Sequence, residues 1–144
     1  MANLTFDSVQ LDMQLPELVR GVDQRVITQN AAASLDYNPI HVNPAWAKKI
    51  DFLGEGTTIG HGMCTLSFMT SVVTNWCAPS GGFVSGLESK FIRPVRPGDT
   101  ITCKGVISEK HPRQMGKSFV VIELSAENQR GDTVAVARAR VNLQ

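Results

Sequence analysis

The chain has 144 residues and a formal net charge of +1, and charged side chains make up 19% of it. This length suits one domain with a full hydrophobic core, so we expect residues 1–144 to form a single domain. A charge balance this close to neutral gives no long-range field that would attract nucleic acid or an anionic membrane. We therefore expect partners at local sites, with no nucleic acid and no membrane among them.

The cysteine content points to a reducing compartment. Three cysteines occur, without C-x-x-C spacing. This odd number argues against a disulfide framework, and the spacing argues against a zinc knuckle. The first residues lack the basic start and the continuous apolar run of a signal peptide. The sequence thus predicts a cytoplasmic protein.

The N-terminal quarter predicts one strand and one helix. Residues 5–22 mix short apolar runs with turn formers, which suits an edge strand and a lead-in. Asp23 can cap a helix over residues 24–34. The side chains expected to face the core from this helix are Val26, Ile27, Ala31 and Leu35.

A loop and a short helix are predicted next. Pro39 forces the residue before it out of the helical region, so residues 36–41 are predicted to form a loop. Asn43 as N-cap, followed by proline at the first helical position, predicts a short helix over residues 44–49. Residues 51–60 hold three glycines and are expected to form an irregular connection.

The stretch from His61 to Cys77 is predicted to be a central helix. No Asp, Glu, Lys or Arg occurs between Glu55 and Glu88. A helix that is apolar nearly all round requires burial on all sides. This one is too short and too rich in hydroxyl groups for a membrane span. At helical spacing its apolar residues form two adjacent stripes: Ile59, Met63, Leu66, Thr70, Val73 and Cys77, and Cys64, Phe68, Val72 and Trp76.

After this helix the hydrophobic period changes from 3.6 to 2, which indicates strands. Strands are predicted over residues 83–91, 100–110, 118–128 and 133–143, with turns or loops at 79–82, 93–99, 111–117 and 129–132. Helices followed by a run of antiparallel strands indicate an α+β fold. The row of alanines in the last strand suits a sheet against which a thick helix packs. We therefore expect a sheet wrapped around the central helix.

The chemistry is expected at Asp36 and His41, which are five residues apart across a proline. A tight turn can bring both side chains to one point, where they can hold a water between them. The alternative is that both are ordinary solvent-exposed loop residues. Gly62 strengthens the first interpretation, because its backbone N–H at a helix start can bind an oxygen that becomes negative. His61 is interpreted as a helix-start residue rather than as a base.

These motifs together resemble the MaoC-like, or R-specific, enoyl thioester hydratases. The resemblance is carried by Asp36-x-Asn38-Pro39-Ile40-His41, by Pro44, Ala45, Ala47 and Phe52, by His61-Gly62-Met63, and by residues 91–99. It covers nearly the whole chain and departs at Asn43, where many members have Asp. It implies the hot-dog fold, in which an antiparallel sheet wraps around one long helix.

The resemblance also implies roles for individual residues. Asp36 and His41 would activate the water that adds to C3 of a trans-2-enoyl thioester, and would handle the proton at C2. The Gly62 N–H would bind the thioester oxygen. Asn38 would support the loop or contact Asp36, and Thr70 would line the acyl tunnel unless it only packs in the core. No metal and no redox cofactor is implied.

The expected substrate is a thioester of coenzyme A or of a carrier protein. The expected assembly is a homodimer, because a single sheet leaves an edge open. Two alternatives remain: a partner subunit of a heterodimeric 3-hydroxyacyl carrier-protein dehydratase that mainly shapes the acyl tunnel, and a hot-dog thioesterase. The intact pair of Asp36 and His41 argues against the first, and the Asn-Pro-x-His motif argues against the second.

Overall fold

The computed structural model of the protein describes residues 4–114 and 118–143. Five strands form one antiparallel sheet in the order β1-β3-β4-β5-β2. The elements in chain order are β1 (Leu18–Val22), α1 (Gln24–Ser34), α2 (Pro39–Val42), α3 (Pro44–Ile50), α4 (Gly62–Cys77), a short 3-10 helix (Ala78–Ser80), β2 (Phe83–Phe91), β3 (Asp99–His111), β4 (Phe119–Glu127) and β5 (Thr133–Asn142).

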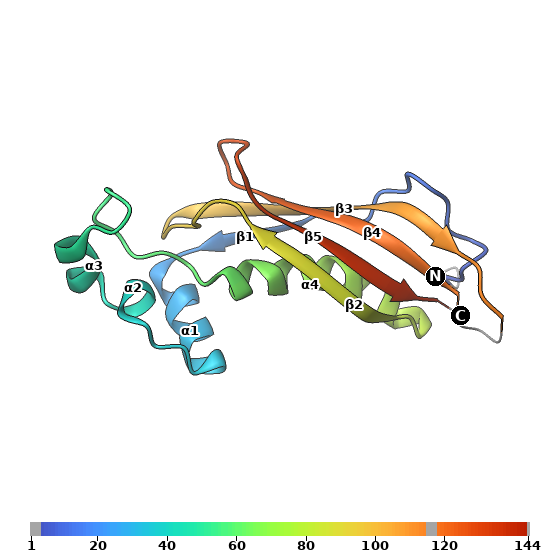
Figure 1. Ribbon diagram of the computed structural model, residues 1–144, viewed down its shortest axis with the longest axis horizontal. Coiled ribbons are helices and arrows are strands. Elements are labelled where there is room, and N and C mark those ends of the chain that lie inside the picture. The colour runs from blue at the N-terminus through green and yellow to red at the C-terminus, as the bar shows by residue number, and fades with distance from the viewer. Residues whose placement is uncertain (1–3, 115–117, 144) are drawn as a thin grey trace.

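Helix α4 lies against one face of the sheet, which curves over it (Figure 1). Met69, Val73 and Cys77 on this helix have no solvent-exposed surface. Most of the sheet residues that pack in the same core come from β3, β4 and β5, and one comes from β1: Val22, Ile101, Cys103, Ile107, Val120, Ile122, Leu124, Ala126, Val134, Ala135, Ala137, Ala139 and Val141. This arrangement confirms the predicted α+β hot-dog fold. Among the described residues, no helix is both long enough and apolar enough to cross a membrane.

The N-terminal half differs from the prediction in three places. Strand β1 covers only the last part of residues 5–22, and Gln14 adds an isolated bridge to Val106. Residues 36–41 are not wholly a loop, since α2 begins at Pro39, the favoured first helical position. Leu35 does not face the core but is 78% exposed, because it ends α1 in a left-handed conformation with φ of 60°.

The helices α1, α2 and α3 form an extension beyond the N-terminal end of α4 (Figure 1). Two contacts tie the connection between α3 and α4 to the loop between β2 and β3. The Gly60 N–H donates to the Val95 carbonyl at 2.7 Å, and Arg96 forms an ion pair with Glu55. The extension is therefore held over one end of the sheet.

Strand β2 is an edge strand, and much of its surface faces solvent. It pairs with β5 on one side only. Phe83 and Phe91 in this strand are 59% and 45% exposed, whereas Leu87 packs against the core. The open edge of β2 thus carries large apolar side chains at both ends.

The junction between the end of α4 and the start of β2 depends on the absence of a side chain at position 82. A Cβ atom added to Gly82 would lie 2.9 Å from Cys77 Cβ and 2.9 Å from Leu143 Cδ2. We expect Gly82→Ala to lower the free energy of unfolding by about 1–3 kcal/mol, because overpacking forces its neighbours to move. Urea unfolding followed by circular dichroism measures this change.

Gly21→Ala is the matched control. A Cβ atom at Gly21 would meet nothing within 4 Å, so we expect a change within about 0.5 kcal/mol. Equal destabilisation by both substitutions would contradict the overpacking explanation.

Candidate active site

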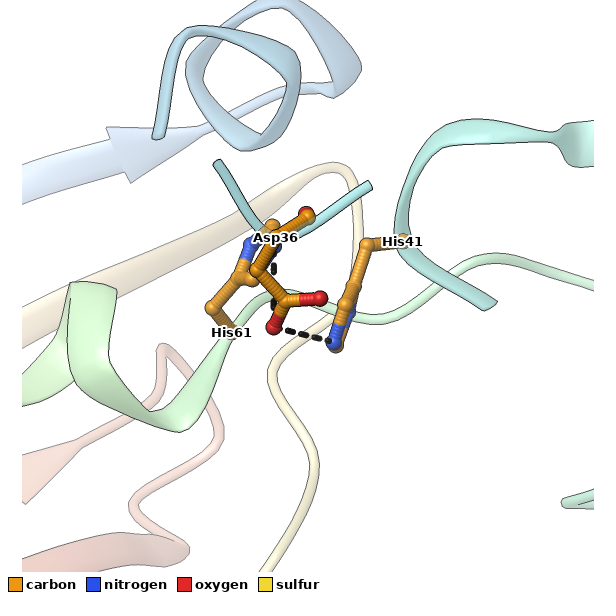
Figure 2. A group of neighbouring side chains, drawn as sticks. All are labelled: Asp36, His41 and His61. Carbon is orange, nitrogen blue, oxygen red and sulfur yellow. Dashed lines mark hydrogen bonds and ion pairs between the residues drawn. The ribbon is translucent and has the colours of Figure 1, made fainter. Parts of the chain in front are cut away.

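Asp36, His41 and His61 come together at the base of the extension (Figure 2). The Asp36 Oδ2 atom lies 4.0 Å from His41 Nε2 and 3.8 Å from His61 Nε2. The two imidazole rings are stacked, with centroids 3.8 Å apart and planes inclined by 26°. The structure thus brings together the predicted pair Asp36 and His41 and adds a second histidine.

The local chain geometry turns Asp36 toward the histidines. Leu35 adopts a left-handed conformation, which costs a residue with a side chain about 1–2 kcal/mol, and so redirects the chain just before Asp36. The Asn38 N–H donates to Asp36 Oδ1 at 3.3 Å, and the Asn38 side chain accepts from the Ile40 N–H at 3.2 Å as the N-cap of α2. Asn38 thus contacts Asp36 and caps α2, and its role in the reaction stays a prediction.

The orientation and tautomer of His41 are set by a backbone carbonyl. His41 Nδ1 lies 2.8 Å from the Ile59 carbonyl oxygen, which can only accept, so Nδ1 carries the proton. In the neutral ring, Nε2 therefore keeps a free lone pair on the side of Asp36. The Ile59 N–H donates to the Ile40 carbonyl at 3.2 Å, so α2 and the connection before α4 are held side by side.

His61 is more than a helix-start residue. Its backbone makes it the N-cap of α4, but its side chain makes no capping hydrogen bond and is only 4% exposed. Its Nε2–H donates to the Asp36 carbonyl at 3.0 Å. The sequence analysis missed this contact. The available signal was that histidine is not among the residues preferred at an N-cap, so capping alone does not explain a histidine at this position.

A cavity of about 310 Å³ opens beside His41. It joins His41 to the start of α4 and to the segment that follows β2. Its lining residues are His41, Ile59, Gly60, Gly62, Thr65, Phe91, Ile92, Arg93, Pro94, Val95 and Val134. Asp36 is not in this lining, and its side chain is 54% exposed.

Gly62 places the start of α4 in the wall of this cavity. The N–H groups of a first helical turn have no intrahelical partner and sit at the positive end of the helix dipole. A Cβ atom at Gly62 would lie 2.9 Å from Phe91 Cδ2, so only glycine lets the Phe91 ring come this close. His41 and a potential oxyanion donor thus face one cavity.

Thr70 lies further along α4 and is half-buried. Its hydroxyl donates to the Leu66 carbonyl of its own helix at 2.8 Å, and Thr70 is not among the residues that line this cavity. A role for Thr70 in a deeper acyl tunnel stays a prediction.

Asp36, His41 and His61 each offer a ligand atom, all within 4.8 Å of one another, so their spacing would allow a metal ion. The hydrogen bonds favour another use. His61 Nε2 is committed as a donor to the Asp36 carbonyl, and two stacked rings direct their lone pairs side by side rather than at one point. The arrangement is better suited to binding a water and transferring a proton than to binding a metal cation.

Three comparisons relate this site to known proteins. The family model described as the MaoC like domain matches residues 10–129. An (R)-specific enoyl-CoA hydratase of Rhodospirillum rubrum is 33% identical over 101 residues, which cover 67% of this chain and 68% of that protein. The chain belongs to the MaoC-like dehydratase family.

Two solved structures share the fold of this MaoC-like chain. The R-hydratase PhaJ1 from Pseudomonas aeruginosa, in its unliganded form, has a TM-score of 0.85 at 23% identity, with 98% of this chain and 86% of that chain covered. A protein named as a monoamine oxidase regulatory protein, from Archaeoglobus fulgidus, has a TM-score of 0.86 at 29% identity, with 97% and 94% covered.

The cysteines of this MaoC-like protein are buried free thiols, and Cys64 is in the first turn of α4. Burial raises the pKa of Cys64 and Cys77, and it raises the pKa of Cys103 to about 11. Burial disfavours the charged thiolate, which is the nucleophilic form. None of the three is thus suited to act as a nucleophile at neutral pH.

We expect the native protein to resist a thiol-specific reagent such as DTNB at pH 8, because the raised pKa values leave little thiolate. Unfolding in guanidinium chloride should then release three reactive thiols per chain. A colour assay with and without denaturant makes this measurement. One thiol that reacts at once in the native state would overturn the assignment.

Proposed function

We propose that this protein catalyses R-specific hydration of trans-2-enoyl thioesters and the reverse dehydration of R-3-hydroxyacyl thioesters. The observation that carries the proposal is the fixed tautomer of His41. Its Nε2 lone pair is free, and the Nε2 atom lies 4.0 Å from Asp36 Oδ2. His41 also lines a cavity whose wall includes Gly62 at the start of α4. The substrate class named for the related hydratase of Rhodospirillum rubrum supports the same chemistry.

In the proposed mechanism, Asp36 and His41 hold the attacking water. A separation of 4.0 Å between Oδ2 and Nε2 allows one water to hydrogen-bond to both. His41 Nε2 takes a proton as the water oxygen bonds to C3, and the electrons of the C2=C3 bond move toward the thioester oxygen. The proton then passes to C2, which restores the carbonyl and yields the 3-hydroxyacyl product.

The start of α4 would stabilise the negative charge that develops in this step. The Gly62 N–H and the helix dipole act at the cavity wall, where an enolate oxygen would lie. Removing one such donor typically costs about 2.7–4 kcal/mol of barrier. Because this donor is part of the backbone, it needs no reorganisation when the charge appears.

The alternative of a non-catalytic partner subunit is less well supported. Asp36, His41 and Gly62 all belong to one chain, and the loop and carbonyl contacts that orient them are also within that chain. A subunit that only shaped a tunnel would not need this arrangement.

We further propose that two copies assemble through β2. An edge strand with one open side is prone to pair with another strand, and its own copy is the natural partner in a two-fold dimer. Phe83 at one end and Phe91 at the other would then be covered.

The buried free thiols suit a reducing compartment, which supports a cytoplasmic location.

The purified chain should hydrate short or long trans-2-enoyl-CoA, or the matching carrier-protein thioester, to the R-3-hydroxyacyl product. Asp36→Asn and His41→Gln should each lower kcat by about 10²–10⁴, because each removes one member of the acid/base pair. Loss of enoyl absorbance gives the rate, and chiral chromatography gives the configuration.

Asp7→Asn and His111→Gln are the matched controls, since Asp7 is exposed at the N-terminal end and His111 lies in β3. Both should keep the wild-type rate. An Asp36 or His41 variant with near-normal kcat would refute the assigned pair. Release of free coenzyme A from the enoyl thioester would instead indicate a thioesterase.

The proposed dimer predicts a solution mass of about twice the 15.7 kDa of one chain. Phe83→Lys should shift the protein toward the monomer, because it places a charge at the β2 interface. Phe52→Lys, at a 75% exposed phenylalanine in the connection that follows α3, should leave the dimer intact. Light scattering coupled to gel filtration tests this, and a monomeric wild type at micromolar concentration would contradict it.

A further inference from the structure

Gln24 makes polar contacts with both segments that position His41. Its Nε2–H donates to the His41 carbonyl at 2.8 Å, and its Oε1 accepts from the Thr58 hydroxyl at 2.5 Å. The same Nε2 lies 3.4 Å from Thr28 Oγ1. One side chain therefore links α2 to the connection that precedes α4.

Thr58 is a buried polar residue in a connection whose residues 51–57 and 59–60 are exposed or half-buried. It is only 1% exposed, whereas residues 51–55 before it are all exposed. A hydroxyl buried to this degree requires a hydrogen-bond partner, and Gln24 Oε1 supplies one. The contact fixes Thr58 and with it the next residue, Ile59.

Ile59 carries the carbonyl that holds the His41 ring. His41 Nδ1–H donates to that carbonyl at 2.8 Å, so the position of Ile59 sets both the tautomer and the ring orientation. The Gln24 amide acts on His41 from the other side, through the His41 carbonyl. Gln24 and Thr58 thus restrain the backbone of His41 and the partner of its ring.

The support for Gln24 is itself rigid. Gln24 is the first residue of α1, and the N-cap Asp23 accepts from the Val26 N–H at 2.8 Å. Ile27 and Ala31 of the same helix have no exposed surface, so α1 is anchored in the core. Because the start of α1 is fixed in this way, the Gln24 side chain can hold His41 and Thr58 in fixed positions.

We propose that Gln24 and Thr58 are positioning residues that hold His41 in its reactive tautomer and orientation. The inference rests on the proposed function of His41 as a base. Neither residue is assigned to the reacting atoms. Their contribution is to keep Nε2 of His41 aligned with the water and with C3 of the substrate, where small misplacement is costly.

Two substitutions test the two contacts separately. Gln24→Glu keeps an acceptor for Thr58 but places an acceptor against the His41 carbonyl, whereas Thr58→Val removes only the hydroxyl. Each should lower kcat by about tenfold to a hundredfold while KM stays within about twofold, because alignment is lost and binding is not. Thr58→Ser, which restores the hydroxyl, should recover most of the rate, and Gln29→Glu on the exposed side of α1 should have no effect.

Nitrogen NMR of the His41 ring provides a readout that does not need activity. The wild type should show the proton on Nδ1, and both variants should show a mixture of tautomers or a broadened signal. Absence of hydration in the wild type would refute the proposed function, while this NMR difference would still support the link between Gln24, Thr58 and His41. Variants with a lowered melting temperature but with unchanged kcat and unchanged His41 signals would overturn the positioning role.

Discussion

The burial of α4 is the constraint on which the rest of the structure depends. This helix has no charged residue, and its side with Met69, Val73 and Cys77 is buried under the sheet. The expected burial on all sides is not found, because Met63, Ser67 and Asn75 are exposed. The sheet curves over the buried side, with alanines in β5 where the two come close. The same burial fixes the N-terminal end of α4, and with it Gly62, in the wall of the cavity.

Backbone carbonyls, rather than charged side chains, orient both histidines of the site. The Ile59 carbonyl holds the ring of His41, and the Asp36 carbonyl holds the ring of His61. Each carbonyl belongs to a segment that approaches from a different part of the chain. The geometry of the site thus depends on how three segments pack against one another: α2, the connection before α4, and the end of α1.

The sequence predicted the features that depend on local periodicity and on short motifs. The uncharged stretch around α4 and the alternation in β3 to β5 led to an α+β fold with a sheet wrapped around one helix, and the family resemblance implied the hot-dog fold. The spacing of Asp36 and His41 across a proline led to the candidate pair. It could not predict that Leu35 turns outward, because a left-handed residue with a side chain has no sequence signal. Nor could it predict the contacts that His61 and Gln24 make, since these join segments far apart in the chain.

The attachment of the extension has a consequence for how the protein loses order. Helix α2 has no buried residue and α3 has only Ala47, whereas β3 to β5 supply most of the core. Segments with few buried apolar contacts open at lower free energy than the global transition. Amide protons of α2 and α3 should therefore exchange with solvent well before those of the sheet. Mild heat would then disorder the site in a molecule whose secondary structure is still largely intact.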